Sequence, residues 1–235
     1  MAPVFPSPLS DCAMEETPVI TKTSAPGRQG RRARPGNTTG DVILNAAEFV
    51  FARHGYAGAT VKRIAKQAKC YESLIYYHFG NKDKLFAAVI KNAYQKLIKA
   101  EQALDLDMNS PEQALTDIVL FMWNYYQKNP ELIILLNTEN LLKGKHLAKL
   151  GPMDEFLSPA LSVIREAVLK GGESGVFRRD VDILDLYTTI MGLGYFYLSN
   201  RYTLSVFFGR DLMQEAERRR WGQVIVQTVL ATLRP

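Results

Sequence analysis

The chain has 235 residues with a formal net charge of +5, a length that allows two domains with a core each. It lacks the run of about 18 uninterrupted apolar residues that a transmembrane helix requires. The first residues contain prolines and acids without an apolar segment, so we expect neither a signal peptide nor membrane association. Two cysteines, Cys12 and Cys70, are too few for a disulfide framework and favour a reducing, cytoplasmic location.

Residues 1 to 38 are rich in Pro, Ser, Thr and Gly, show no hydrophobic period and contain a cluster of arginines. This composition predicts a disordered, basic N-terminal tail. The arginines are Arg28, Arg31, Arg32 and Arg34. They either lie along a phosphate backbone or in a minor groove, or they belong to a tail that is only solvated.

Two helices are predicted next. In the first, from residue 41 to 54, apolar residues recur at three- and four-residue steps, and Gly55 ends the helix as a C-cap. The second follows Thr60, a good N-cap, with one apolar and one basic face. The apolar positions of the two helices are Ile43, Ala46, Ala47, Val50, Phe51, Val61, Ile64, Ala65 and Ala68.

A turn at residues 69 to 71 leads to a third helix, predicted for residues 72 to 79 and ended by Gly80. Its inner residues are Ile75 and Phe79, which leaves mostly polar side chains outward. Asn81 then caps a further helix with two lysines in its first turn. Two short helices joined by a tight turn, with the second exposing polar groups, are typical of a helix-turn-helix that reads a major groove.

The segment from 41 to 90 resembles the TetR-type bacterial transcriptional regulators. The resembling residues are the run 43 to 49, the run 51 to 56, Thr60, Ile64, Ala65, Ala68, the run 75 to 79, Asn81, Lys82 and the run 84 to 86. The resemblance implies an all-α fold with three parts. These are the tail at 1 to 38, a helix-turn-helix DNA-binding domain at 39 to 85, and a helical effector-binding and dimerisation domain at 86 to 235.

The resemblance also implies which residues contact double-stranded operator DNA. They are Thr60, Lys62, Glu72, Ser73, Leu74, Tyr76, Tyr77, His78 and Lys82. Two positions depart from the family. Lys69 replaces the usual glycine of the turn, so it either does without a positive φ or is mildly strained. Tyr71 replaces the usual Ser or Thr cap, so the recognition helix depends on its packing at that end.

The charge is unevenly distributed. Residues 1 to 85 contain 12 Lys and Arg against seven Asp and Glu, whereas residues 86 to 235 contain 17 of each kind. All of the excess positive charge therefore lies in the proposed DNA-binding end, as a polyanionic partner requires.

The rest of the chain reads as helices. They are predicted at 82 to 103, from Pro111, from Pro130 to about 142, from Pro159 to about 172, along an apolar run from about 185 to 208, and from 212 to 233. The last two are apolar nearly all round. They are either buried in the monomer or paired with a second copy, and the resemblance implies the pairing, in a homodimer.

The resemblance further implies a small-molecule effector, and the C-terminal part is similar to a subgroup that governs the catabolism of aromatic or heteroaromatic compounds. The candidate ligand residues are Trp123, Tyr126, Phe156, Arg165, Tyr195 and Arg201. Aromatic residues at helical spacing also serve as plain core, and salt bridges explain the two arginines equally well.

An enzyme is disfavoured. The three histidines and the scattered carboxylates have no metal-ligand spacing, and no nucleophile or phosphate-loop motif occurs, so we expect no catalytic residue, no metal and no cofactor. The sequence predicts a sequence-specific DNA-binding transcriptional regulator, a dimeric repressor that an effector releases from its operator. The alternative is a dimeric ligand-binding or interaction protein without operator binding.

Overall fold

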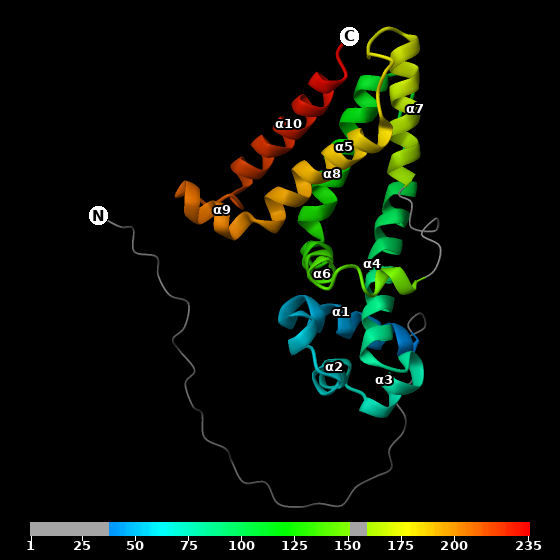
Figure 1. Cartoon of the computed structure of the whole chain (residues 1–235), viewed down its shortest axis with the longest axis vertical. Helices are drawn as coiled ribbons and strands as arrows, with labels where there is room; N and C mark the ends of the chain where they lie inside the picture. The colour runs from blue at the N-terminus through cyan, green and yellow to red at the C-terminus, as the bar shows by residue number, and fades with distance from the viewer. Residues whose placement is uncertain (1–37, 151–158) are drawn as a thin grey trace, which may run out of the picture. The chain divides into compact units, whose positions relative to one another are not determined.

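The computed structural model describes residues 38 to 150 and 159 to 235, and those residues form helices and loops without a strand. The helices are α1 (Thr39–Gly58), α2 (Val61–Ala68), α3 (Glu72–Phe79), α4 (Lys82–Gln102), α5 (Pro111–Lys128), α6 (Pro130–Leu141), the short 3-10 helix η1 (Leu147–Lys149), α7 (Pro159–Glu173), α8 (Ile183–Ser199), α9 (Arg201–Phe208) and α10 (Glu215–Thr232) (Figure 1). The all-α prediction is confirmed. The predicted tail, except Thr38, and Phe156 lie outside the described residues.

The predicted N-terminal helices are confirmed. Thr38 and Asp41 form a capping box at the start of α1, and Gly55, at φ 65°, breaks the helix where the sequence predicted its end, although one more turn reaches Gly58. Helices α1 to α4 share a core of side chains that are almost fully shielded from solvent. Its most buried members are Ile43, Ala47, Phe51, Ile64, Ile75, Leu85 and Phe86.

Helix α4 belongs to this core at its start and packs against α6 and α7 further along. Helix α5 packs against α7, α8 and α10, and α6 lies against α1, α4 and α8 (Figure 1). Helix α5 starts at Pro111, as predicted, and turns Leu115, Ile118 and Met122 into the core. None of the helices in the described ranges combines the length and the apolar character of a membrane span.

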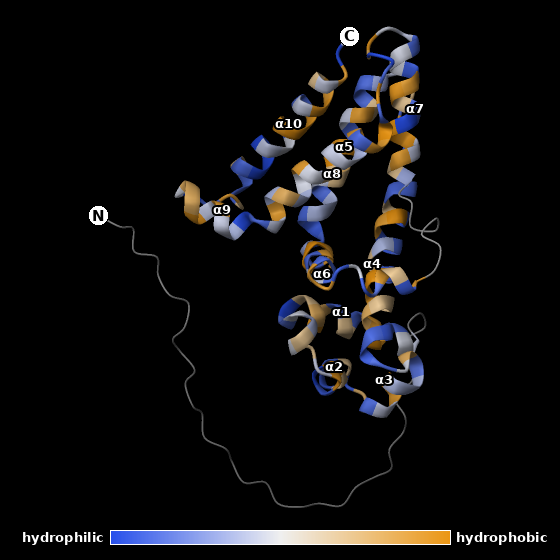
Figure 2. Ribbon diagram, in the orientation of Figure 1, coloured by the Kyte–Doolittle hydropathy of each residue, from blue (hydrophilic) through white to orange (hydrophobic). Residues whose placement is uncertain are grey.

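One prediction about the C-terminal helices is wrong. The apolar run up to residue 208 is not a single helix, because Asn200 ends α8 and starts α9. Its side chain donates to the carbonyl oxygen of Phe196 at 2.9 Å, which satisfies a free carbonyl at the end of α8. Phe207 therefore lies on α9, where its side chain is 79% exposed. Figure 2 shows the hydrophobic residues of α9 in this separate short helix.

Candidate nucleic-acid interface

Helix α2 presents its basic face to solvent. The backbone N–H of Arg63 donates to the hydroxyl of Thr60 at 3.2 Å, so Thr60 is the N-cap, as predicted. The opposite face holds Ile64 in the core, which leaves Lys62 and Lys66 exposed. Lysine side chains free to extend from an exposed helix suit contacts to phosphate oxygens.

The turn after α2 depends on one strained lysine. Lys69 lies in the left-handed region, at φ 54° and ψ 42°. Of the two predicted possibilities, a lysine without a positive φ and a mildly strained lysine, the second therefore holds. The backbone N–H of Lys69 donates to the Lys66 carbonyl at 3.3 Å, and that of Cys70 donates to the Ala65 carbonyl at 3.0 Å. These bonds close the last turn of α2 and redirect the chain into α3. Cys70 is half-buried and its burial raises the pKa of the thiol, which disfavours a reactive thiolate.

Helix α3 is held by few residues and exposes the rest. Ile75 is fully buried, and Leu74 and Phe79 are half-buried against the same core. Tyr71, at the N-cap, makes no capping side-chain hydrogen bond, so the helix start relies on packing, as predicted. The outward residues are Glu72, Ser73, Tyr76, Tyr77 and His78, with Tyr76 50% and Tyr77 82% exposed. Each of these side chains has a polar group that can bond to a base edge or a phosphate.

Helix α4 adds a positioned cation. The Asn81 side chain accepts from the backbone N–H of Lys84 at 2.9 Å and so caps α4, which confirms the prediction for Asn81. The Lys82 ammonium lies 4.4 Å from the centre of the Tyr56 ring, and desolvation lowers the pKa of Lys82. This half-buried lysine is therefore held at one place beside the recognition helix.

The structure thus places all the predicted contact residues on α3, at the N-cap and first turn of α2, or at the first residue of α4. Leu74 and Lys82 are half-buried, and the others are exposed. Gly40 in the first turn of α1 lies close to the His78 ring. The exposed residues form a polar and basic surface built on a small apolar core.

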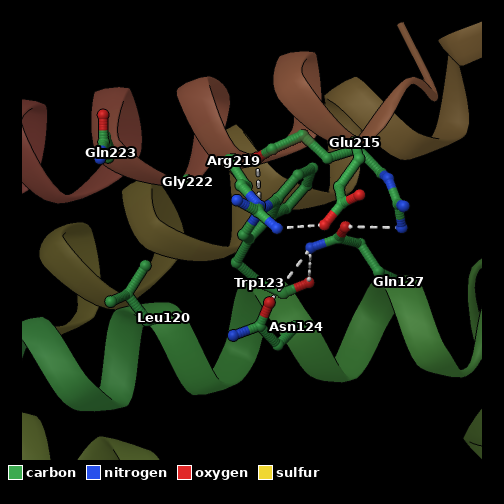
Figure 3. A pocket seen from close by; sticks show the side chains of 9 residues that line it. Leu120, Trp123, Asn124, Gln127, Glu215, Arg219, Gly222 and Gln223 are labelled. Carbon is green, nitrogen blue, oxygen red and sulfur yellow. Dashed lines mark hydrogen bonds and ion pairs between the residues drawn. The ribbon is translucent and has the colours of Figure 1, made fainter.

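The predicted ligand residues do not share one cavity. Trp123 lies in a groove of about 420 Å³ between α5 and α10, where its indole N–H donates to the Arg218 carbonyl at 3.1 Å (Figure 3). Arg165 lines a different groove, of about 430 Å³, beside the segment that leads into α8. Arg201 donates to the Leu198 carbonyl, and its guanidinium lies 4.4 Å from the ring centre of Tyr202. These three side chains therefore serve different places.

Tyr126 and Tyr195 belong to a group of tyrosines on α4, α5 and α8 that are close enough to influence one another's pKa. Burial raises the pKa of Tyr126, and Tyr187, Glu101 and Tyr94 add to the effect. The pKa of Tyr94 is raised by its own burial and by Tyr187 and Tyr195. The Tyr195 hydroxyl donates to the Asn137 side chain and accepts from Asn140 at 3.3 Å. Sequence reasoning missed Tyr94, although it lies one turn from the buried Ile90 and Leu97 on the same helix.

Comparison with known proteins agrees with this geometry. Residues 43–89 match the model of the bacterial regulatory proteins of the tetR family, and residues 111–229 match the tetracyclin repressor-like C-terminal domain. The chain is 39% identical to the HTH-type transcriptional repressor NicS of Pseudomonas putida over 88% of its own length and 98% of that protein. It is 30% identical to the HTH-type transcriptional repressor SCO4008 of Streptomyces coelicolor, over 68% of this chain and 79% of that one.

Solved structures show the same fold. SCO4942 of Streptomyces coelicolor superimposes with a TM-score of 0.63 at 24% identity, covering 84% of this chain and 100% of that one. The fatty acid degradation regulator FadR of Bacillus halodurans gives a TM-score of 0.59 at 23% identity, over 83% and 99% of the two chains. The fold and the exposed helix-turn-helix define a DNA-binding transcriptional regulator. The chain belongs to the tetR family of bacterial regulatory proteins.

Proposed function

We propose that this protein is a dimeric repressor that binds its operator through α3 and the first residues of α2 and α4, and that a small-molecule effector releases it. The observation that carries this proposal is the construction of α3. One fully buried residue, Ile75, fixes the helix, and five outward side chains present polar groups next to the basic face of α2. The names of the relatives NicS and SCO4008, both repressors, support repression.

The contacts divide into two kinds. Lys62 and Lys82 bind phosphate oxygens and set the position on the duplex. Glu72, Ser73 and Tyr76 read base edges in the major groove, while Thr60, Leu74, Tyr77 and His78 complete the contact surface. A protein that acts on operator DNA in a bacterium works in the cytoplasm.

A second copy completes the DNA reader. The apolar surface formed by Phe196 on α8 and Tyr202, Val206, Phe207 and Phe208 on α9 is at least 58% exposed at every residue. Several large apolar side chains exposed on one short helix and the end of the helix before it are typical of a protein interface. A two-fold dimer places two recognition helices about 34–36 Å apart, one turn of the duplex.

The effector site is proposed among the tyrosines of α4, α5 and α8. Tyr126 and Tyr195 bring phenol groups, and Asn137 and Asn140 bring amides, which together suit an aromatic or heteroaromatic compound with polar substituents. An effector acts by preferring the arrangement in which the two recognition helices no longer fit successive grooves. Residues 86 to 235 would then be the effector-binding and dimerisation domain.

The test is a titration of the DNA upstream of its own gene, with a random duplex as reference. We expect Tyr76→Ala to weaken specific binding by about 10- to 30-fold, as the loss of one base contact does. Lys82→Ala should lower the salt dependence by about one unit while changing sequence preference little. Lys99→Ala is the matched control, since Lys99 is exposed near the other end of α4.

Unchanged affinity in both the Tyr76 and Lys82 variants would remove the support for this interface. Equal binding of the upstream and random duplexes by the wild-type protein would favour the alternative, a dimeric ligand-binding or interaction protein without operator binding.

A further inference from the structure

A single carboxylate joins three segments where the N-terminal helices meet α6. Asp83, the second residue of α4, accepts a hydrogen bond from the Tyr56 hydroxyl, which comes from the end of α1. Its other oxygen accepts from the Lys145 ammonium at 2.8 Å, and Lys145 follows α6. We call the three side chains of Asp83, Tyr56 and Lys145 the clasp.

The clasp strongly favours the ionised carboxylate. The hydrogen bonds from Lys145 and Tyr56 lower the pKa of Asp83 to about 2. Desolvation and the bond to Asp83 raise the pKa of the Tyr56 hydroxyl to about 12. At neutral pH the carboxylate is therefore charged and the phenol is protonated, as both hydrogen bonds require.

The position of Lys145 is fixed by a buried pair. Glu139 on α6 accepts from the backbone N–H groups of His146 and Leu147 at 2.6 and 2.9 Å. Its second oxygen lies 2.8 Å from Nδ1 of His146, and both side chains are at most 2% exposed. The other ring nitrogen of His146, Nε2, is buried without a hydrogen-bond partner in the described part of the chain and lies 4.0 Å from the Asp83 carboxylate. The Glu139 contacts hold one geometry strongly, because breaking them would leave a buried carboxylate uncompensated in a medium of low polarity. The backbone directly after Lys145 is thus held to the Glu139 side chain on α6.

The same cluster reaches the proposed DNA contacts. The His146 ring packs against the rings of Tyr56 and Phe86, with centroids 5.1 and 4.9 Å away. The face of the Tyr56 ring holds the ammonium of Lys82, next to Asp83 in sequence. A displacement of α6 therefore acts through Lys145 on Asp83, and through Tyr56 on Lys82.

We propose that the clasp is the point through which α6, and with it the C-terminal helices, sets the position of the DNA-reading segments. This inference rests on the proposed function. The three residues of the clasp are positioning residues, since they act on operator affinity through α4 and Lys82 without contacting DNA themselves.

The sign of one substitution separates this role from simple electrostatics. Asp83→Asn removes a negative charge near the DNA-binding surface, so electrostatics alone predicts tighter binding. The clasp predicts the opposite, a loss of about 5- to 20-fold in affinity for the upstream duplex. Asp105→Asn, at an exposed carboxylate far along the chain, makes the same charge change as a control.

Two further variants dissect the clasp. Tyr56→Phe changes no charge and keeps the ring under Lys82, so a loss of about 3-fold or more reports on the hydroxyl alone. Lys145→Met should weaken DNA binding. The double variant with Asp83→Asn should bind little worse than either single variant, because both substitutions remove the same Lys145–Asp83 interaction. Lys149→Met removes a neighbouring cation that is outside the clasp, and should have an effect of less than about 2-fold on specific affinity.

Hydrogen exchange of the DNA-free protein gives a readout that does not depend on operator binding. Asp83→Asn and Tyr56→Phe should each speed amide exchange in residues 80 to 86 and 142 to 147, with little change in α10. Unchanged exchange in these segments, or affinity that rises in Asp83→Asn, would overturn the clasp. Absence of specific DNA binding by the wild-type protein would instead count against the proposed function, while the exchange data still decide whether the clasp couples the segments.

Discussion

Helices α3 and α9 have the same length, eight residues, and both expose aromatic side chains, yet they suit different partners. Helix α3 buries Ile75 completely and exposes Tyr76 and Tyr77, whose hydroxyl groups can bond to a wet, polar surface. Helix α9 buries no residue and exposes one tyrosine, Tyr202, together with Phe207 and Phe208, whose rings have no polar atom. Exposure of aromatic side chains alone therefore does not identify a partner. The two phenylalanines without a polar atom are what make α9 less suited than α3 to a polar surface such as DNA.

The largest expected effect comes from placing one negative charge on the exposed surface of either helix. Phe207→Glu should weaken self-association by about 100-fold, because central aromatic contacts of an interface are each worth about 2–4 kcal/mol. Tyr77→Glu, at a side chain of similar exposure, should leave self-association unchanged and abolish operator binding by placing a carboxylate against phosphates. Sedimentation equilibrium and DNA titration of both variants measure the two effects.

The comparison of α3 and α9 fails if either substitution does not act on the partner assigned to its helix. Self-association that is equal in Phe207→Glu and wild type would remove α9 from the dimer interface. A loss of self-association in Tyr77→Glu would mean that α3 lies at the contact between copies. Circular dichroism of each variant shows whether the helical content is retained, so that loss of binding is not mistaken for unfolding.

The sequence allowed more to be predicted for α3 than for α9, and the reason is local chemistry. Thr60, Gly80 and Asn81 mark the ends of the first short helices through their own caps and turn geometry. The apolar spacing around Ile75 then gives the buried face. At α9 the hydrophobic pattern continues across Asn200 without a glycine or proline, so periodicity alone predicted one long helix.

Contacts between distant segments were the part that the sequence could not provide. Asp83 and Lys145 are 62 residues apart, and nothing in the local pattern around either one indicates the other. The same holds for Tyr195 and Asn137, and for Trp123 and the carbonyl of Arg218. The predicted ligand residues were chosen by residue type, which is why the structure distributes them over several grooves.

A smaller effect concerns the backbone at the C-cap of α2 and of α9. Both use the left-handed region, with Lys69 at φ 54° and Gly209 at φ 64°. A side chain in that region costs about 1–2 kcal/mol, partly offset by the greater unfolded-state freedom of glycine. We therefore expect Lys69→Gly to stabilise the fold by about 0.5–1 kcal/mol and Gly209→Ala to destabilise it by about 1 kcal/mol. Urea unfolding without DNA, at one protein concentration, measures both. Equal signs would mean that local contacts outweigh the backbone term.

The smallest expected effect is a pH dependence of the unfolding free energy. It comes from an ionised carboxylate close to α3, and α9 has no such group. Helix α3 leads into α4, whose Asp83 has its pKa lowered to about 2 from an ordinary value of 3.8 by the bonds from Lys145 and Tyr56. Because the folded-state pKa is lowered, this stabilisation is present above pH 3.8 and is lost as the pH falls through about 2. The carboxylate is 38% exposed, so solvent screening limits the change to less than about 1 kcal/mol.

Urea unfolding of the wild type and of Asp83→Asn at pH 5, 4, 3 and 2.5 should therefore give a difference in unfolding free energy that shrinks towards acid. Tyr56→Phe, which keeps the Lys145 bond, should lie between them. A difference that stays constant with pH would mean that the Asp83 carboxylate is not held ionised by its two partners. Among the described contacts of its own residues, α9 has no such ionic support. The contrast between the two helices would then rest on packing alone.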